Sequence, residues 1–109
     1  MKKGKRDYHC SFVRLGRDLI FRSDPWRVLS PRAKVLYLTL KAKYNGSNNG
    51  DIRLCYSELK TNSGFRSPKS ISDAIKELEK GGWVERVKRG GLYRYENRFR
   101  LTGKFDVLL

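Results

Sequence analysis

Apolar residues recur at helical spacing in the stretch that follows Ser67. They form one stripe, which consists of Ile71, Ala74, Ile75 and Leu78. Ser67 is a favoured N-cap residue, and Pro68 suits the first helical position, where an N–H has no intrahelical partner. Gly81 follows as a C-cap that can adopt the left-handed conformation. The pattern predicts one capped amphipathic helix over 67–80, which is either an ordinary surface helix or a helix that reads DNA.

The same proline signal predicts two more helices. Pro25 follows Asp24 and Pro31 follows Ser30, so an N-capping residue type precedes each proline. The first helix is expected to be a single turn over 25–29, with Trp26 and Leu29 packing inward, and the second to run over 31–44. The wide apolar face of the second consists of Val35, Leu36, Leu38, Thr39, Leu40 and Ala42, and its outward residues are Arg32, Lys34, Lys41 and Lys43.

A polar turn over 45–51 ends this helix. Ile52, Leu54 and Tyr56 then alternate with polar residues and predict a short strand. A short helix follows over 57–62, capped by Cys55 or by Ser57, of which we favour Ser57. The turn over 61–66 leads into the helix at 67–80, so a short helix, a polar turn and a capped second helix follow one another. This order is typical of a helix-turn-helix.

The residues after Gly82 predict a β-hairpin, with strands over 83–89 and 92–102 and a tight turn at Gly90-Gly91. One face of the second strand holds Tyr93, Tyr95, Asn97, Phe99 and Leu101, and the other holds Arg94, Glu96, Arg98 and Arg100. The aromatic face, together with Trp83, is expected to be core, although such rings can also stack on single-stranded nucleic acid. The basic face is either a solvated edge or a surface for phosphates.

The charge balance favours a polyanionic partner. Among 109 residues, Lys and Arg outnumber Asp and Glu by 25 to 11, which gives a net charge of +14. We expect one α+β domain over 8–109, preceded by a basic flexible tail over 1–7 that is solvated or follows a phosphate backbone. No apolar run is long enough to span a membrane and no signal-peptide core follows the basic start, so a cytoplasmic protein is expected.

Metal binding and catalysis have little support in the residue types. Cys10, Cys55 and His9 are too few for a four-ligand zinc site. Without a secretory signal both cysteines are expected to be reduced, and one disulfide between them is the alternative. There is no Gly-rich phosphate loop and no recognisable nucleophile set, while Asp51 and Glu58 are more simply solvated or capping groups. We therefore expect no enzyme activity, no cofactor, no metal and no small-molecule ligand.

The order of predicted elements over about 30–103 resembles the winged helix-turn-helix family of DNA-binding domains. The likeness is carried by Ser70-Ile71-Ser72-Asp73-Ala74-Ile75-Lys76-Glu77-Leu78-Glu79-Lys80-Gly81-Gly82-Trp83-Val84. It combines a polar helix start, an Ala-x-x-x-Leu core pair, and glycine before two bulky residues that open the wing. The stretches Tyr44-Asn45-Gly46-Ser47-Asn48-Asn49-Gly50 and Ile52-Arg53-Leu54 look like a subgroup of phage and mobile-element proteins that includes replication-type modules.

The resemblance implies three main helices, a short strand and a C-terminal hairpin wing. Helix 67–80 would enter the major groove of double-stranded DNA, and the wing over 83–102 would follow the backbone or the minor groove. The implied DNA-binding residues are Arg66, Lys69, Ser70, Ser72, Asp73, Lys76, Lys88, Arg89 and Arg94. Asp73 could accept a hydrogen bond from cytosine, or be a solvated or salt-bridged side chain.

The expected role is that of a transcriptional regulator or a replication-type module. Binding to RNA or to nucleic acid without sequence preference, and a protein-interaction role for the wing, are the alternatives that the charge also allows. A homodimer is possible because reading helices often work in pairs on two half-sites. The apolar residues within 12–21 and 105–109 would then either make the dimer contact or complete the core.

Overall fold

The computed structural model describes residues 12–88 and 97–108, which form an α+β fold. Within these residues there are five helices and three strands. In chain order they are α1 (Arg17–Arg22), α2 (Asp24–Arg27), α3 (Pro31–Lys43), β1 (Ile52–Leu54), α4 (Tyr56–Ser63), α5 (Pro68–Lys80), β2 (Val84–Lys88) and β3 (Asn97–Leu101). From α2 onward, the order and type of the elements agree with the sequence prediction. The predicted tail over 1–7 and the turn at Gly90-Gly91 lie outside the described residues.

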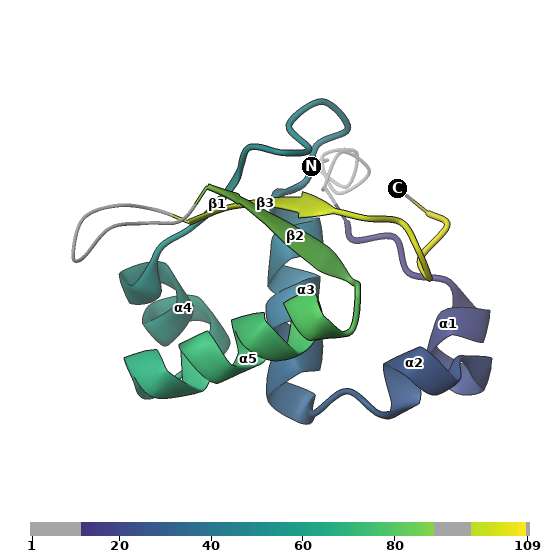
Figure 1. Ribbon diagram of the computed structural model, residues 1–109, viewed down its shortest axis with the longest axis horizontal. Helices are drawn as coiled ribbons and strands as arrows, with labels where there is room; N and C mark the ends of the chain where they lie inside the picture. Colours follow the sequence, from purple (N-terminus) through teal and green to yellow (C-terminus); the bar gives the residue numbers. More distant parts are fainter. Residues whose placement is uncertain (1–11, 89–96, 109) are drawn as a thin grey trace, which may run out of the picture.

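The three strands form one antiparallel sheet in the order β1-β3-β2. Strand β3 is therefore central, and its Phe99 lies opposite Ile52 of β1 and Arg86 of β2. The sheet lies above α3, α4 and α5, while α1 and α2 lie to the right (Figure 1). Phe99 and Leu101 are buried, so the predicted apolar face of this strand does face the core over its described part.

Serine caps set the starts of α3 and α5 as predicted. The Ser30 hydroxyl accepts the N–H of Ala33 at 3.1 Å, and the Ser67 hydroxyl accepts the N–H of Ser70 at 3.2 Å. The predicted cap of α2 is wrong by one residue, because Ser23 accepts the N–H of Trp26 and Asp24 is already helical.

Two other ends differ from the prediction. Helix α4 begins at Tyr56 with Cys55 as its N-cap, not at Ser57, because the Cys55 carbonyl already accepts the N–H of Leu59 at 3.2 Å. At the end of α5, Gly81 keeps a right-handed backbone with φ −77°, and Gly82 takes the left-handed one with φ +84°. The Gly81 N–H still donates to the Glu77 carbonyl, so the turn comes one residue later than predicted.

The buried face of α3 agrees with the prediction at Leu36 and Leu40, but it is narrower and shifted around the helix. It consists of Ala33, Leu36, Tyr37, Leu40 and Lys41, which follow helical spacing, whereas Val35 and Ala42 are exposed. The sheet and α5 cover one stripe of α3 rather than a wide band, so only residues on that stripe are excluded from water.

Lys41, predicted on the outside, lies inside a buried polar cluster. Its Nζ is 2.8 Å from an Asp106 carboxylate oxygen, and both side chains are almost fully buried. The same Nζ donates to the Arg14 carbonyl and, at 3.2 Å, to the Leu108 carbonyl. The Tyr37 hydroxyl donates to Asp106 as well. Helix α3 is thereby bonded to Arg14, which precedes α1, and to Asp106 and Leu108, which follow β3.

The flanking segments complete the core in part. Leu19 is buried, and Leu15 and Phe105 pack against the core. Phe105 continues an aromatic cluster whose other members are Trp26, Tyr37 and Trp83. Phe12 and Val107 remain exposed. A dimer contact through these segments stays a prediction.

Candidate nucleic-acid interface

Helix α5 has two opposite faces. Ile71, Ala74, Ile75 and Leu78 are buried, as the apolar stripe predicts. A helix advances roughly 100° per residue, so the opposite side carries Lys69, Ser72, Asp73, Lys76 and Lys80. The three lysines are exposed, and Ser72 and Asp73 are half-buried. We call these five residues the outer stripe of α5. It presents three lysines, one serine and one aspartate along one line.

A carboxylate from α5 fixes the helix against α3. Glu77 accepts two hydrogen bonds of 2.7 Å, one from the backbone N–H of Ser30 and one from its hydroxyl. Ser30 is itself the N-cap of α3. A side chain from α5 therefore binds the N-cap residue of α3. This contact sets the position of α5 relative to the rest of the fold.

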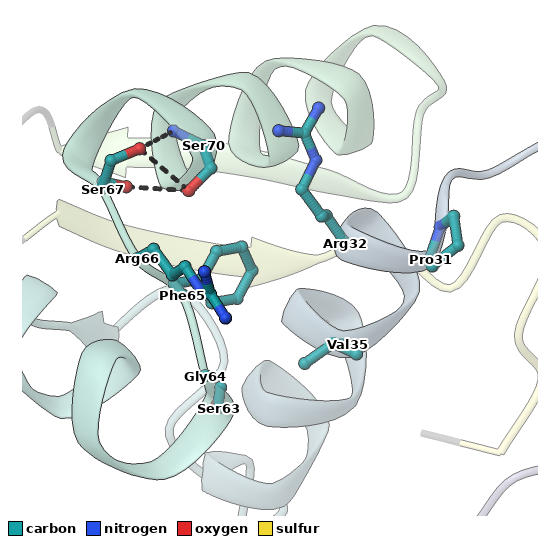
Figure 2. Close-up of a pocket in the computed structure, with 9 residues that line it drawn as sticks. All are labelled: Pro31, Arg32, Val35, Ser63, Gly64, Phe65, Arg66, Ser67 and Ser70. Atoms are coloured by element: carbon teal, nitrogen blue, oxygen red, sulfur yellow. Dashed lines mark hydrogen bonds between the residues drawn. The ribbon is translucent and has the colours of Figure 1, made fainter.

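The start of α5 borders a hollow of about 400 Å³ between α3 and the α4–α5 connection. Figure 2 shows Arg32 and Val35 on the α3 side and Phe65, Arg66 and Ser67 on the other. Arg66 is exposed, as a phosphate contact requires. Phe65 is buried and anchors the connection in the core.

Ser70 belongs to the helix cap rather than to the outer stripe. Its hydroxyl donates to the Ser67 carbonyl at 2.9 Å and lies 3.3 Å from the Ser67 hydroxyl (Figure 2). The side chain thus already has local partners. Ser72 is the serine that lies on the outer stripe.

The described arginines of the sheet are paired with acids. Arg86 lies 3.0 Å from Glu79 and Arg98 lies 3.2 Å from Asp51, and Arg100 pairs with Glu85 across the strands. Lys43 likewise pairs with Glu58. Asp51 and Glu58 are thus ion-paired, which adds a role to the solvated or capping one that their sequence suggested. Arg53 lies 3.7 Å from the same Asp51, so four described arginines of the sheet share three acids.

The cations around α5 are mostly free of such partners. Within the described ranges, no acidic side chain lies within 4.0 Å of the charged groups of Arg66, Lys76 or Lys80. Lys69 is the exception, because its Nζ lies 3.1 Å from Asp73. The salt-bridged alternative for Asp73 is therefore the arrangement observed. Arg66, Lys76 and Lys80 thus leave positive charge without an acidic partner on this helix and its approach. The same holds elsewhere among the described residues for Arg14, Arg17, Arg32, Lys34, Lys60 and Lys104.

The predicted wing contacts lie largely beyond the described residues. Lys88 is the last residue of β2 and pairs with Arg98 in the sheet register, but its side chain is outside the described part. Arg89 and Arg94 also lie outside it, as do Tyr93 and Tyr95. Trp83 and Phe99 are buried, so these two rings are core, as predicted.

Two further features are absent from the part of the chain that the structure covers. No group of three His, Cys, Asp or Glu side chains there could hold a metal ion. None of its helices has the length and apolar character needed to cross a bilayer. Comparisons with models of protein families, with curated proteins and with solved structures find no match for this chain.

Proposed function

We propose that this chain is a double-stranded DNA-binding protein of the winged-helix type, with α5 in the major groove. The order α3, β1, α4, α5, β2, β3 and the sheet order β1-β3-β2 support the proposal. They are the arrangement in which a short helix and a turn present a second helix, and a hairpin follows it.

The observation that carries the proposal is the outer stripe of α5. Three exposed lysines and two short polar side chains share the side of the helix opposite its buried stripe. The major groove admits one α-helix, whose polar face reaches base edges and phosphates. Glu77 and the buried stripe hold α5 in place. The outer stripe would therefore face the DNA without a conformational change of the protein.

The backbone contacts follow from the charge distribution. Arg66 stands at the approach to α5, and Lys76 and Lys80 lie along it, all without acidic partners among the described residues. The described sheet cations are paired. Wing contacts would therefore come from Lys88, Arg89 and Arg94, as the resemblance implies. A role as a transcriptional regulator or as a replication-type module fits this mode of binding equally well.

A selection from random DNA duplexes tests the proposal. The full chain is expected to enrich a defined motif, and the motif duplex is then used in titrations at several salt concentrations. Replacing Arg66 with Gln is expected to lower the salt slope by about 0.9, because one phosphate contact releases about that many counterions. Arg17→Gln is the matched control, since this exposed arginine lies on α1, at the other end of the fold (Figure 1).

Three outcomes would count against the proposal. A selection that enriches no motif would contradict sequence-specific binding. Structured RNA that displaces the labelled duplex more readily than random duplex does favours an RNA-binding role. Equal effects of Arg66→Gln and Arg17→Gln on the salt slope would mean that the approach to α5 is not the contact surface.

A further inference from the structure

Asp73 is an acid in the middle of a basic surface. On the outer stripe of α5 it lies between Lys69 and Lys76, and the other stripe residues are Ser72 and Lys80. A carboxylate facing duplex DNA is repelled by phosphates, so it weakens binding that depends on charge alone. A surface that only binds phosphates gains nothing from an acid at this position.

The ion pair with Lys69 gives little reason for the acid in the free protein. The lysine precedes the acid by four residues, which is the less favourable order for such a pair on a helix. Lys69 also lies in the first turn of α5, which contains no acid and where the helix dipole disfavours a cation. Its side chain is 83% exposed, and exposed pairs contribute little to stability.

The pair places a donor beside an acceptor on the exposed side of the helix. Lys69 Nζ and the Asp73 carboxylate are 3.1 Å apart, and an ammonium has three N–H donors, so Lys69 can keep this contact and bind a second acceptor. In the major groove, a G·C pair displays two acceptors on guanine and the amino donor of cytosine. A lysine donor beside an aspartate acceptor is complementary to the hydrogen-bonding groups of that base pair.

On the basis of the proposed function, we infer that Asp73 is a specificity-determining residue that accepts a hydrogen bond from a cytosine amino group. Lys69 donates to guanine acceptors at the same step. Both residues lie in the N-terminal half of α5, the part of a reading helix that meets base edges. The acid then has two effects. It strengthens binding where cytosine is present and weakens binding everywhere else.

These opposite effects can be measured with Asp73→Ala. On the selected motif, the variant is expected to lose roughly tenfold in affinity, because the cytosine contact is gone. On random duplex, the same variant is expected to bind more tightly than the unmodified protein, because a repulsive charge has been removed. A purely structural role for Asp73 would move both affinities in the same direction.

Two further variants sharpen the test. Asp18→Ala is the matched control, because Asp18 also forms an exposed pair with an arginine four residues later, on α1. Asp18→Ala removes one negative charge, as Asp73→Ala does. It is expected to leave the ratio of the affinity for the motif to the affinity for random duplex unchanged. Asp73→Asn is expected to shift the selected cytosine toward adenine, since an amide can bond to adenine N6 and N7 together.

The results separate the inference from the proposed function. If Asp73→Ala changes the two affinities by the same factor, or if Asp73→Asn selects the unmodified motif, Asp73 does not read a base, while DNA binding by α5 stands. If the unmodified protein enriches no duplex motif, both the function and the inference fail. Equal melting temperatures of the variants would show that an affinity change is not a folding defect.

Discussion

At the residue scale, the stability of the fold is expected to depend strongly on the buried contacts of Lys41. Its side chain is 3% exposed, and its ammonium is held by Asp106 and by two carbonyls. Removing one partner of such a pair leaves a charge in the interior without compensation. We expect Asp106→Ala to lower the free energy of unfolding by about 3–5 kcal/mol, measured by urea denaturation.

A double variant checks the cause of that loss. Lys41→Met combined with Asp106→Leu buries no unpaired charge, so it is expected to lose less stability than Asp106→Ala alone. If the double variant instead loses the sum of the two single changes, the ion pair is not the source of the effect.

Tyr37 predicts a dependence on alkaline pH. Burial raises the pKa of its hydroxyl far above the usual value of about 10, and the hydrogen bond to Asp106 raises it further. Above pH 10 the unfolded chain loses this proton and the folded chain keeps it. The contribution of Tyr37 to stability is therefore complete below pH 10 and falls above it, by about 1.4 kcal/mol per pH unit.

Denaturation curves between pH 9 and pH 11 would measure this decline, and Tyr37→Phe should show a shallower one. Tyrosinate absorbance gives an independent readout, since Tyr37 should ionise only when the chain unfolds. Equal slopes for the two proteins would contradict the assignment.

At the element scale, the position of α5 depends on the contact between Glu77 and Ser30. Glu77→Ala removes two charge-assisted hydrogen bonds of 2.7 Å and leaves the start of α3 without this partner. We expect a loss of about 2 kcal/mol in the free energy of unfolding. Glu85→Ala is the matched control, because its pair with Arg100 is exposed and is expected to contribute at most about 1 kcal/mol. Similar losses in the two variants would mean that Glu77 is an ordinary surface acid.

The elements were largely predictable because local chemistry specifies them. Serine before proline set the starts of α3 and α5, and the apolar spacing of α5 identified its buried face. The errors arose where a residue distant in the sequence determines whether a side chain is buried or which partner it binds. The polar type of Lys41 predicted exposure, but Asp106, 65 positions later, supplies its partner. Likewise, nothing near Ser30 in the sequence indicates Glu77.

The candidate site was predictable only in outline. Spacing along α5 placed Lys69, Ser72 and Lys76 on one outer line, and the described structure agrees. Ser70 was included only through the resemblance to the winged-helix family, and its hydroxyl belongs to the cap. Arg32 was missed because it belongs to a different helix, and only the packing of α3 brings it to the hollow beside Arg66.

At the scale of the whole molecule, charge is distributed unevenly. The described arginines of the sheet each lie near Glu79, Glu85 or Asp51, whereas Arg66, Lys76 and Lys80 have no acidic partner among the described residues. Helix α5 holds three lysines and three acids, but Glu77 and Glu79 bind Ser30 and Arg86, so lysines outnumber acids by three to one on the outer stripe. An anionic ligand would be attracted by the whole chain and oriented by α5, because potential depends on local as well as total charge.

The ammonium of Lys41 also has a consequence for the order of events during synthesis. Its partners come from Arg14, which is made before α3, and from Asp106 and Leu108, which are made after β3. Until residues 106–108 have left the ribosome, this lysine has no carboxylate to meet and stays hydrated. The interior around α3 thus closes late, and a nascent chain that ends at β3 would expose the surface where Asp106 later binds.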